Sequence, residues 1–143
     1  TDKDGIVMDL LAAEITAKTG KDPAELYRDL EGKFGRPAYK RLDVPASAQQ
    51  RAILQRLTPE MVPAKDLAGD PIIAKLTRAP GNNASIGGLK VLSSQAWFAA
   101  RPSGTEDIYK IYLESFRGDD HLARVEAQAL SLIQEIFAKA GGS

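Results

Sequence analysis

Three short segments with strand-like sequences follow one another in the second half of the chain, and they constrain its fold more than any other feature. They cover residues 89–92, 97–100 and 108–113 and contain aromatic and β-branched residues. Only turn-type residues separate them. Connections this short join antiparallel strands, because parallel neighbours need a crossover of a dozen residues or more. We therefore expect an antiparallel sheet in which consecutive strands are neighbours.

Two further segments have strand patterns, and two helices are expected beside them. Residues 39–44 alternate polar and apolar side chains, and residues 72–78 form a largely apolar run before a turn. Ser47 begins a capping-box pattern for one helix, and Asp119 or Asp120 is expected to cap a long final helix. The apolar stripe of that final helix consists of Leu122, Val125, Ala129, Leu132, Ile133, Ile136 and Phe137. The sequence therefore predicts an α+β fold in which this helix covers one face of the sheet.

The first 36 residues have helical rather than strand-like sequence patterns. Ile6, Leu10, Ala13 and Ala17 recur at helical spacing, and Gly20 is placed to end that helix. A second helix is expected from Pro23 to about Lys33, before Gly35-Arg36-Pro37. Two short helices cannot bury their apolar faces alone, so they must pack on another domain or on something outside this chain. Because the chain starts on a polar run without methionine, we also expect it to be a piece of a longer protein.

Composition excludes several classes of function. The 19 Lys and Arg balance the 19 Asp and Glu, so no diffuse attraction to nucleic acid or to an anionic membrane is expected. With no cysteine and one histidine among 143 residues, we expect no disulfide and no metal site in this chain. No apolar run approaches the roughly 20 residues that span a bilayer. A soluble, cytoplasmic protein is the expectation.

The segment Arg101-Pro102-Ser103-Gly104-Thr105-Glu106-Asp107 lies between two predicted strands and has the composition of an anion-binding turn. Arg101 offers paired, charge-assisted hydrogen bonds, and Ser103 and Thr105 add hydroxyl donors. Gly104 would let the main chain curl so that neighbouring amides converge on an anion. The alternative is a surface turn in which the hydroxyls bond their own backbone and Gly104 supplies a positive φ.

Two other residues, Lys110 and His121, have side chains that could in principle act beside this turn. Lys110 lies just beyond the turn and should share a strand face with Ile108 and Tyr112, from which it could reach the anion. The alternative for Lys110 is an ordinary solvated lysine. His121, near a helix start, is expected at the surface with no role.

The residues of the turn resemble a known family. Residues 101–112, continuing through Glu114-Ser115-Phe116, closely resemble the final-domain phosphate-binding loop of alpha-D-phosphohexomutases, in particular those of the bacterial phosphoglucomutase branch. Residues 77–82, 87–91 and 2–6 are similar as well, so the resemblance covers essentially the whole chain. It implies a four-stranded antiparallel sheet flanked by two helices, like the TATA-box-binding protein, after two short helices. Residues 1–36 would be the helical tail of a preceding domain and the hinge, and residues 37–143 the C-terminal phosphate-binding domain.

The resemblance also implies an activity. Such enzymes interconvert glucose 1-phosphate and glucose 6-phosphate through a phosphoserine and glucose 1,6-bisphosphate, with Mg²⁺ present. By analogy, Arg101, Ser103, Gly104 and Thr105 would hold the phosphate that is not being transferred, and Lys110 would assist them. Lys3 would face the cleft as a catalytic residue.

The phosphoserine, metal and sugar loops of these enzymes belong to three other domains, and their patterns do not occur in this sequence. This chain alone is therefore expected to be inactive, with a sugar phosphate and those three domains as its partners. Two alternatives stay open: a mutase for mannose or glucosamine phosphate, and a free-standing anion-binding module.

Overall fold

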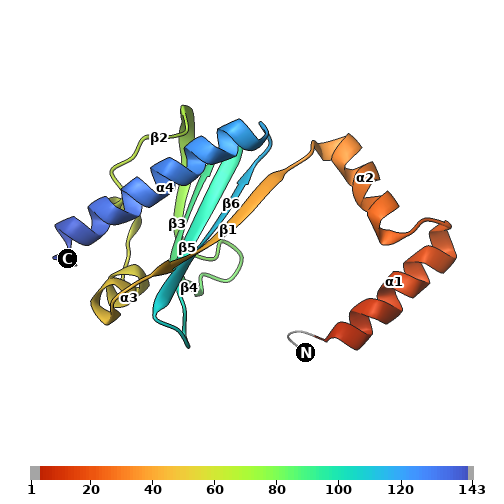
Figure 1. Cartoon of the computed structure of the whole chain (residues 1–143), viewed down its shortest axis with the longest axis horizontal. Coiled ribbons are helices and arrows are strands. Elements are labelled where there is room, and N and C mark those ends of the chain that lie inside the picture. Colours follow the sequence, from red (N-terminus) through yellow and green to blue (C-terminus); the bar gives the residue numbers. More distant parts are fainter. Residues whose placement is uncertain (1–3, 142–143) are drawn as a thin grey trace. The chain divides into compact units, whose positions relative to one another are not determined.

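The computed structural model describes residues 4–141 and contains two compact units, one ending at Arg36 and the other beginning at Pro37 (Figure 1). The first unit consists of α1 (Gly5–Thr19) and α2 (Pro23–Phe34). Asp4 caps α1 by accepting a hydrogen bond from the Val7 amide, and Gly20 ends the helix with a φ of 70°. Neither helix has a buried residue, as expected for helices that cannot bury their apolar faces alone.

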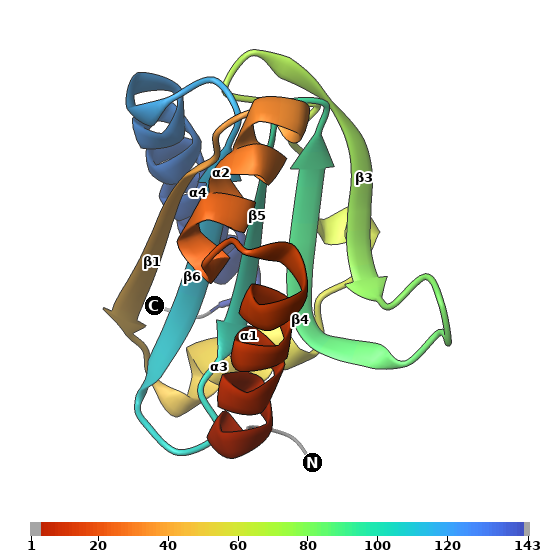
Figure 2. The same ribbon diagram turned by 90° about the vertical axis from the view of Figure 1, so that its right-hand side faces the viewer.

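The second unit contains one antiparallel sheet with strands in the order β1-β6-β5-β4-β3-β2. Its strands are β1 (Ala38–Pro45), β2 (Asp66–Leu67), β3 (Asp70–Arg78), β4 (Ser85–Ser93), β5 (Ala96–Pro102) and β6 (Ile108–Ser115). Consecutive strands from β3 to β6 are neighbours, which confirms the predicted connectivity. Figure 2 shows β1, β6, β5, β4 and β3 side by side in that order.

The α+β class is confirmed, but the strand count implied by the resemblance is wrong. The sheet has six strands rather than four. All five segments expected as strands form strands, and Asp66–Leu67 adds the sixth by pairing with the start of β3. Two residues are too few to show an alternating pattern, so this strand had no signal in the sequence. The further likeness to the TATA-box-binding protein stays a prediction.

Both helices of this unit, α3 (Ala48–Gln55) and α4 (Asp119–Lys139), lie on the same side of the sheet (Figure 1), and a short 3₁₀ turn follows α3 at Pro59–Met61. The whole predicted stripe of α4 is buried. It packs on strand residues such as Phe98, Ile111 and Leu113, and the Tyr109 and Phe137 rings meet edge to face at 5.7 Å. The predicted cap of α4 is wrong, because Gly118 occupies the N-cap and the two aspartates lie in the first turn. There they still favour the positive end of the helix dipole.

Side chains of β6 alternate between the two faces of the sheet. Tyr109, Ile111 and Leu113 are buried under the helices, and Lys110 and Tyr112 point to the other side. Within residues 37–141 no helix covers that second face. We call it the open face; it carries Arg41, Asp43, Lys90, Trp97, Ala99, Arg101, Lys110 and Tyr112.

Candidate functional site

The turn between β5 and β6 begins and ends with a cation. Arg101 lies directly opposite Lys110 in the register of the two strands, and the Ser103 amide donates to the Ile108 carbonyl at 2.9 Å. Like charges placed opposite each other destabilise a strand pair. An anion bound at this point would offset that repulsion, so the register itself favours an anion site here.

The loop already contains a carboxylate at the predicted site. The Ser103 hydroxyl donates to Glu106 Oε2 at 3.4 Å, and Lys110 Nζ lies 3.2 Å from the same oxygen. Ser103 and Lys110 therefore lie close together, as an anion site requires. The anion that they share in the structure is the Glu106 carboxylate. The Thr105 amide also donates weakly to Ser103 Oγ at 3.5 Å. Ser103 thus makes one weak contact of the kind that a turn bonded to its own backbone would have, beside its contact with Glu106.

Gly104 does not have the positive φ that the alternative required. A Cβ built on it would meet no atom within 4 Å. The backbone of the loop therefore does not itself demand a glycine at this position. Gly104 and Thr105 are both exposed at the tip of the loop.

Arg101 is exposed, and among the described residues its guanidinium donates to Tyr112 rather than to a loop hydroxyl. Nη2 donates to the phenol oxygen of Tyr112 at 3.2 Å, and the guanidinium carbon lies 5.6 Å from the centre of the Tyr112 ring. Tyr112 follows Lys110 by two residues and so lies further from the turn. The pKa of Tyr112 is lowered, chiefly because Arg101 donates this hydrogen bond.

The other end of the loop is anchored to the chain between β1 and α3. Arg51 Nη1 lies 2.5 Å from Asp107 Oδ1 and also donates to the Ala46 carbonyl at 3.1 Å. The Ala46 amide donates to the Asp107 carbonyl at 3.0 Å. Asp107 therefore fixes the base of the loop. Sequence reasoning missed Arg51, because it is separated from Asp107 by 56 positions and no local pattern joins them.

A hollow of about 450 Å³ lies beside Arg101 on the open face. It is lined by Ile86, Gly88, Leu89, Lys90, Trp97, Ala99, Ala100, Arg101 and Tyr112. Lys90 Nζ lies 4.4 Å from the centre of the Trp97 ring, so one face of that ring already has a cation. The backbones of β4 and β5 approach each other closely at Gly88. A Cβ at this position would clash with the Ala100 carbonyl oxygen and lie 3.0 Å from the Arg101 Cα.

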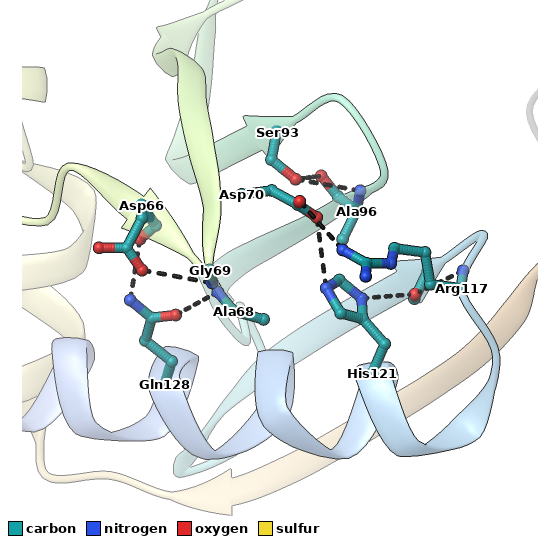
Figure 3. A network of polar contacts seen from close by, with 10 residues as sticks. Asp66, Ala68, Gly69, Asp70, Ser93, Ala96, Arg117, His121 and Gln128 are labelled. Atoms are coloured by element: carbon teal, nitrogen blue, oxygen red, sulfur yellow. Dashed lines mark hydrogen bonds and ion pairs between the residues drawn. The ribbon is translucent and has the colours of Figure 1, made fainter.

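His121 was expected at the surface, and the structure shows this to be wrong, because its side chain is 1% exposed. Nδ1 lies 2.8 Å from Ser115 Oγ, and Nε2 lies 3.3 Å from Asp70 Oδ2 (Figure 3). The second contact is an ion-pair distance without hydrogen-bond geometry, so Nε2 and Oδ2 have no hydrogen-bond partner among the described residues. The signal was available: His121 precedes Val125 by four residues and so lies on the buried stripe of α4.

Ser115, His121 and Asp70 have the residue types of a hydrolytic triad, but Ser115 is fully buried. A nucleophile must reach its substrate, so this arrangement is structural. The Arg117 amide donates to Ser115 Oγ at 3.0 Å, and Arg117 Nη1 donates to Asp70 Oδ1 at 3.1 Å. The network therefore joins β3, β6 and the start of α4.

Lys3 lies outside the described residues. Among residues 4–141, no group of three or more His, Asp or Glu side chains is placed to hold a metal ion. In the same range, no helix is both long enough and apolar enough to cross a bilayer.

Comparison with known proteins gives two findings. Residues 45–132 match the family described as phosphoglucomutase/phosphomannomutase, C-terminal domain. A protein of Komagataeibacter xylinus named phosphoglucomutase is 54% identical over 140 residues, which cover 98% of this chain and 25% of that protein. The chain thus spans about a quarter of the length of the curated relative that it matches. The family match covers β6 and the loop before it, together with most of the sheet and α4, and on this basis the chain belongs to the phosphoglucomutase/phosphomannomutase family, of which it carries the C-terminal domain.

Proposed function

We propose that this chain is the C-terminal part of a phosphoglucomutase and that residues 37–143 bind the substrate phosphate that is not being transferred. The enzyme would interconvert glucose 1-phosphate and glucose 6-phosphate through a phosphoserine and glucose 1,6-bisphosphate, in the cytoplasm. The observation that carries the proposal is the pair of opposed cations, Arg101 and Lys110, around a loop rich in donors. The relative named phosphoglucomutase supports glucose as the sugar.

Different residues of the loop would supply different contacts to the phosphate. A phosphate dianion would take the place of the Glu106 carboxylate between Ser103 and Lys110, since it accepts from the same hydroxyl and ammonium with more oxygens and more charge. The amides of Gly104 and Thr105, at the exposed tip, would add main-chain donors. Arg101 would supply a guanidinium edge for paired hydrogen bonds.

The groups that transfer the phosphoryl group belong elsewhere in this proposal. In such enzymes Mg²⁺ neutralises charge on the transferring phosphoryl group. The side chains described here do not fit that ion, because no cluster of them is placed to hold it. We therefore assign this chain recognition of the substrate, with the three preceding domains of a full-length protein as its partners. Residues 1–36, whose two helices bury none of their own side chains, would be the tail of the third domain and the hinge.

The proposal is tested by titrating the 143-residue chain with glucose 1-phosphate and following its amides by NMR. The amides of Ser103, Gly104 and Thr105 should shift first. Arg101→Ala should weaken binding by about ten- to a hundredfold, because a charge-assisted hydrogen bond contributes roughly 1.5–3 kcal/mol.

Arg124→Ala is the matched control, since Arg124 is an exposed arginine on α4 and the change removes the same charge. Equal weakening by the two substitutions, or first shifts outside the loop, would contradict the proposed site. Sequencing upstream of the gene segment tests the wider proposal. A reading frame that encodes a serine loop, a metal loop and a sugar loop is expected there.

A further inference from the structure

Tyr112 lies at the centre of a row of residues that crosses the open face. It pairs with Arg41 of β1 on one side and with Ala99 of β5 on the other. The guanidinium carbons of Arg41 and Arg101 lie 6.0 and 5.6 Å from the centre of its ring. Because Ala99 has a short side chain, the longer side chain of Arg101 can reach across to the phenol. The tyrosine thus contacts two cations on two neighbouring strands.

The partners of these two arginines differ in charge. Arg41 donates to both carboxylate oxygens of Asp43, at 3.0 and 2.8 Å, so its charge is compensated. Arg101 instead donates to a phenol, which is neutral when protonated. A carboxylate in that place would order the guanidinium but also neutralise it. The phenol orders the guanidinium and leaves its full charge for a ligand.

One hydrogen bond from Nη2 also leaves most of the guanidinium free. The group is planar and has five N–H donors, so holding one corner restricts the plane while the remaining donors stay available. In the described part of the chain, Nη1 and Nε of Arg101 make no hydrogen bond. An arginine that is ordered before binding loses less rotamer entropy when the ligand arrives.

We propose that Tyr112 is a positioning residue for the phosphate: its phenol oxygen holds one corner of the Arg101 guanidinium and keeps the free edge ordered and fully charged. This inference rests on the proposed function, in which Arg101 binds the substrate phosphate. It assigns a role to a residue outside the loop and on the adjacent strand.

A double-mutant cycle tests this role. The 143-residue chain, Tyr112→Phe, Arg101→Ala and the double variant are each titrated with inorganic phosphate and with glucose 1-phosphate, and loop amides are followed by NMR. Tyr112→Phe should weaken binding by about two- to tenfold when Arg101 is present, which is the usual size of one hydrogen bond. It should have no effect in the Arg101→Ala background, since the phenol acts only through the guanidinium.

Tyr39→Phe is the matched control. Tyr39 is on the same face of the sheet, paired with Glu114, and is 57% exposed. It should bind phosphate as the unsubstituted chain does. Equal losses from Tyr112→Phe in both backgrounds would overturn the inference, because the tyrosine would then act independently of Arg101. Weakening by Arg101→Ala with none by Tyr112→Phe would overturn it while leaving the proposed function in place. Failure of the unsubstituted chain to bind either ligand would overturn both.

Discussion

The two cations of the turn, Arg101 at its start and Lys110 at its end, have different kinds of partner. Lys110 is paired with the Glu106 carboxylate, whereas Arg101 is bonded to the Tyr112 phenol. An incoming anion must therefore compete with a charge at Lys110 but not at Arg101. In the proposed function, the affinity for phosphate would therefore depend on that competition as well as on the donors themselves.

Substituting Glu106 tests the competition. Glu106→Gln removes the negative charge that lies 3.2 Å from Lys110 Nζ and should raise affinity for glucose 1-phosphate by about three- to tenfold, measured by NMR titration. Asp107→Asn changes the net charge equally, but Asp107 is paired with Arg51 at the base of the loop. It should raise affinity less. Equal gains from the two substitutions would show that net charge alone, and not occupancy of the site, sets the affinity.

The lowered pKa of Tyr112 predicts a pH dependence for the proposed phosphate binding. Neighbouring cations favour the phenolate, so the folded protein loses this proton below the ordinary tyrosine pKa of about 10. The phenolate would then neutralise Arg101, and affinity for glucose 1-phosphate should fall as the pH rises toward 10. The ligand is already dianionic in this range, so its own charge does not change. Titrations between pH 7.5 and about 10 should show this fall in the unsubstituted chain and a weaker one in Tyr112→Phe. Parallel profiles would contradict the assignment.

Among the elements, the start of α4 is held to the sheet by a buried polar network rather than by a side-chain cap. Its N-cap is Gly118, which makes no side-chain hydrogen bond, and His121 connects the first turn to Ser115 and Asp70. Buried polar groups are costly when they lose a partner. The network should therefore contribute to stability rather than to binding.

His121→Leu tests that contribution. The substitution places an apolar side chain on the buried stripe but leaves Ser115 and Asp70 without the imidazole. It should lower the free energy of unfolding, measured by urea denaturation, by about 1–3 kcal/mol. Phosphate affinity should be unchanged, because the network lies on the helix side of the sheet. Gln134→Leu, at an exposed position of α4, should change stability by less than about 0.5 kcal/mol. A His121→Leu protein as stable as the unsubstituted chain would contradict this role.

Local patterns were sufficient to predict all five long strands and the buried stripe of α4. These patterns were alternation in β1, apolar or β-branched runs bounded by turn-type residues in the other strands, and helical periodicity in α4. They could not predict β2, which is two residues long, or the Gly118 cap, which has no side chain to recognise. In the site, the composition of the loop indicated Ser103 as a donor, and alternation along the strand put Lys110 where it could reach an anion; in the structure both side chains contact Glu106. The contact between Tyr112 and Arg101 was missed, because it depends on the register between β5 and β6.

At the scale of the whole molecule, the two units differ in what they bury. The unit from Pro37 onward has a core of its own beneath α3 and α4. In α1, by contrast, Ile6 is 75% exposed and Leu10 is 66% exposed. A helix of 15 residues is marginal in water without packing. The first unit therefore leaves large apolar side chains exposed, which supports the proposal that it packs on another domain.

Removing residues 1–36 tests this difference. The remaining residues 37–143 should keep the amide NMR spectrum of the sheet and its phosphate titration, because their core is self-contained. The 143-residue chain should self-associate as its concentration rises, through the apolar side chains of α1 and α2, and the shortened chain should stay monomeric. Light scattering during size-exclusion chromatography distinguishes the two. Replacing Ile6 and Leu10 with glutamine in the full chain is the matched control and should reduce association without shortening the chain. A shortened chain that unfolds would mean that the second unit depends on the first. A shortened chain that still associates would mean that the association does not run through α1 and α2.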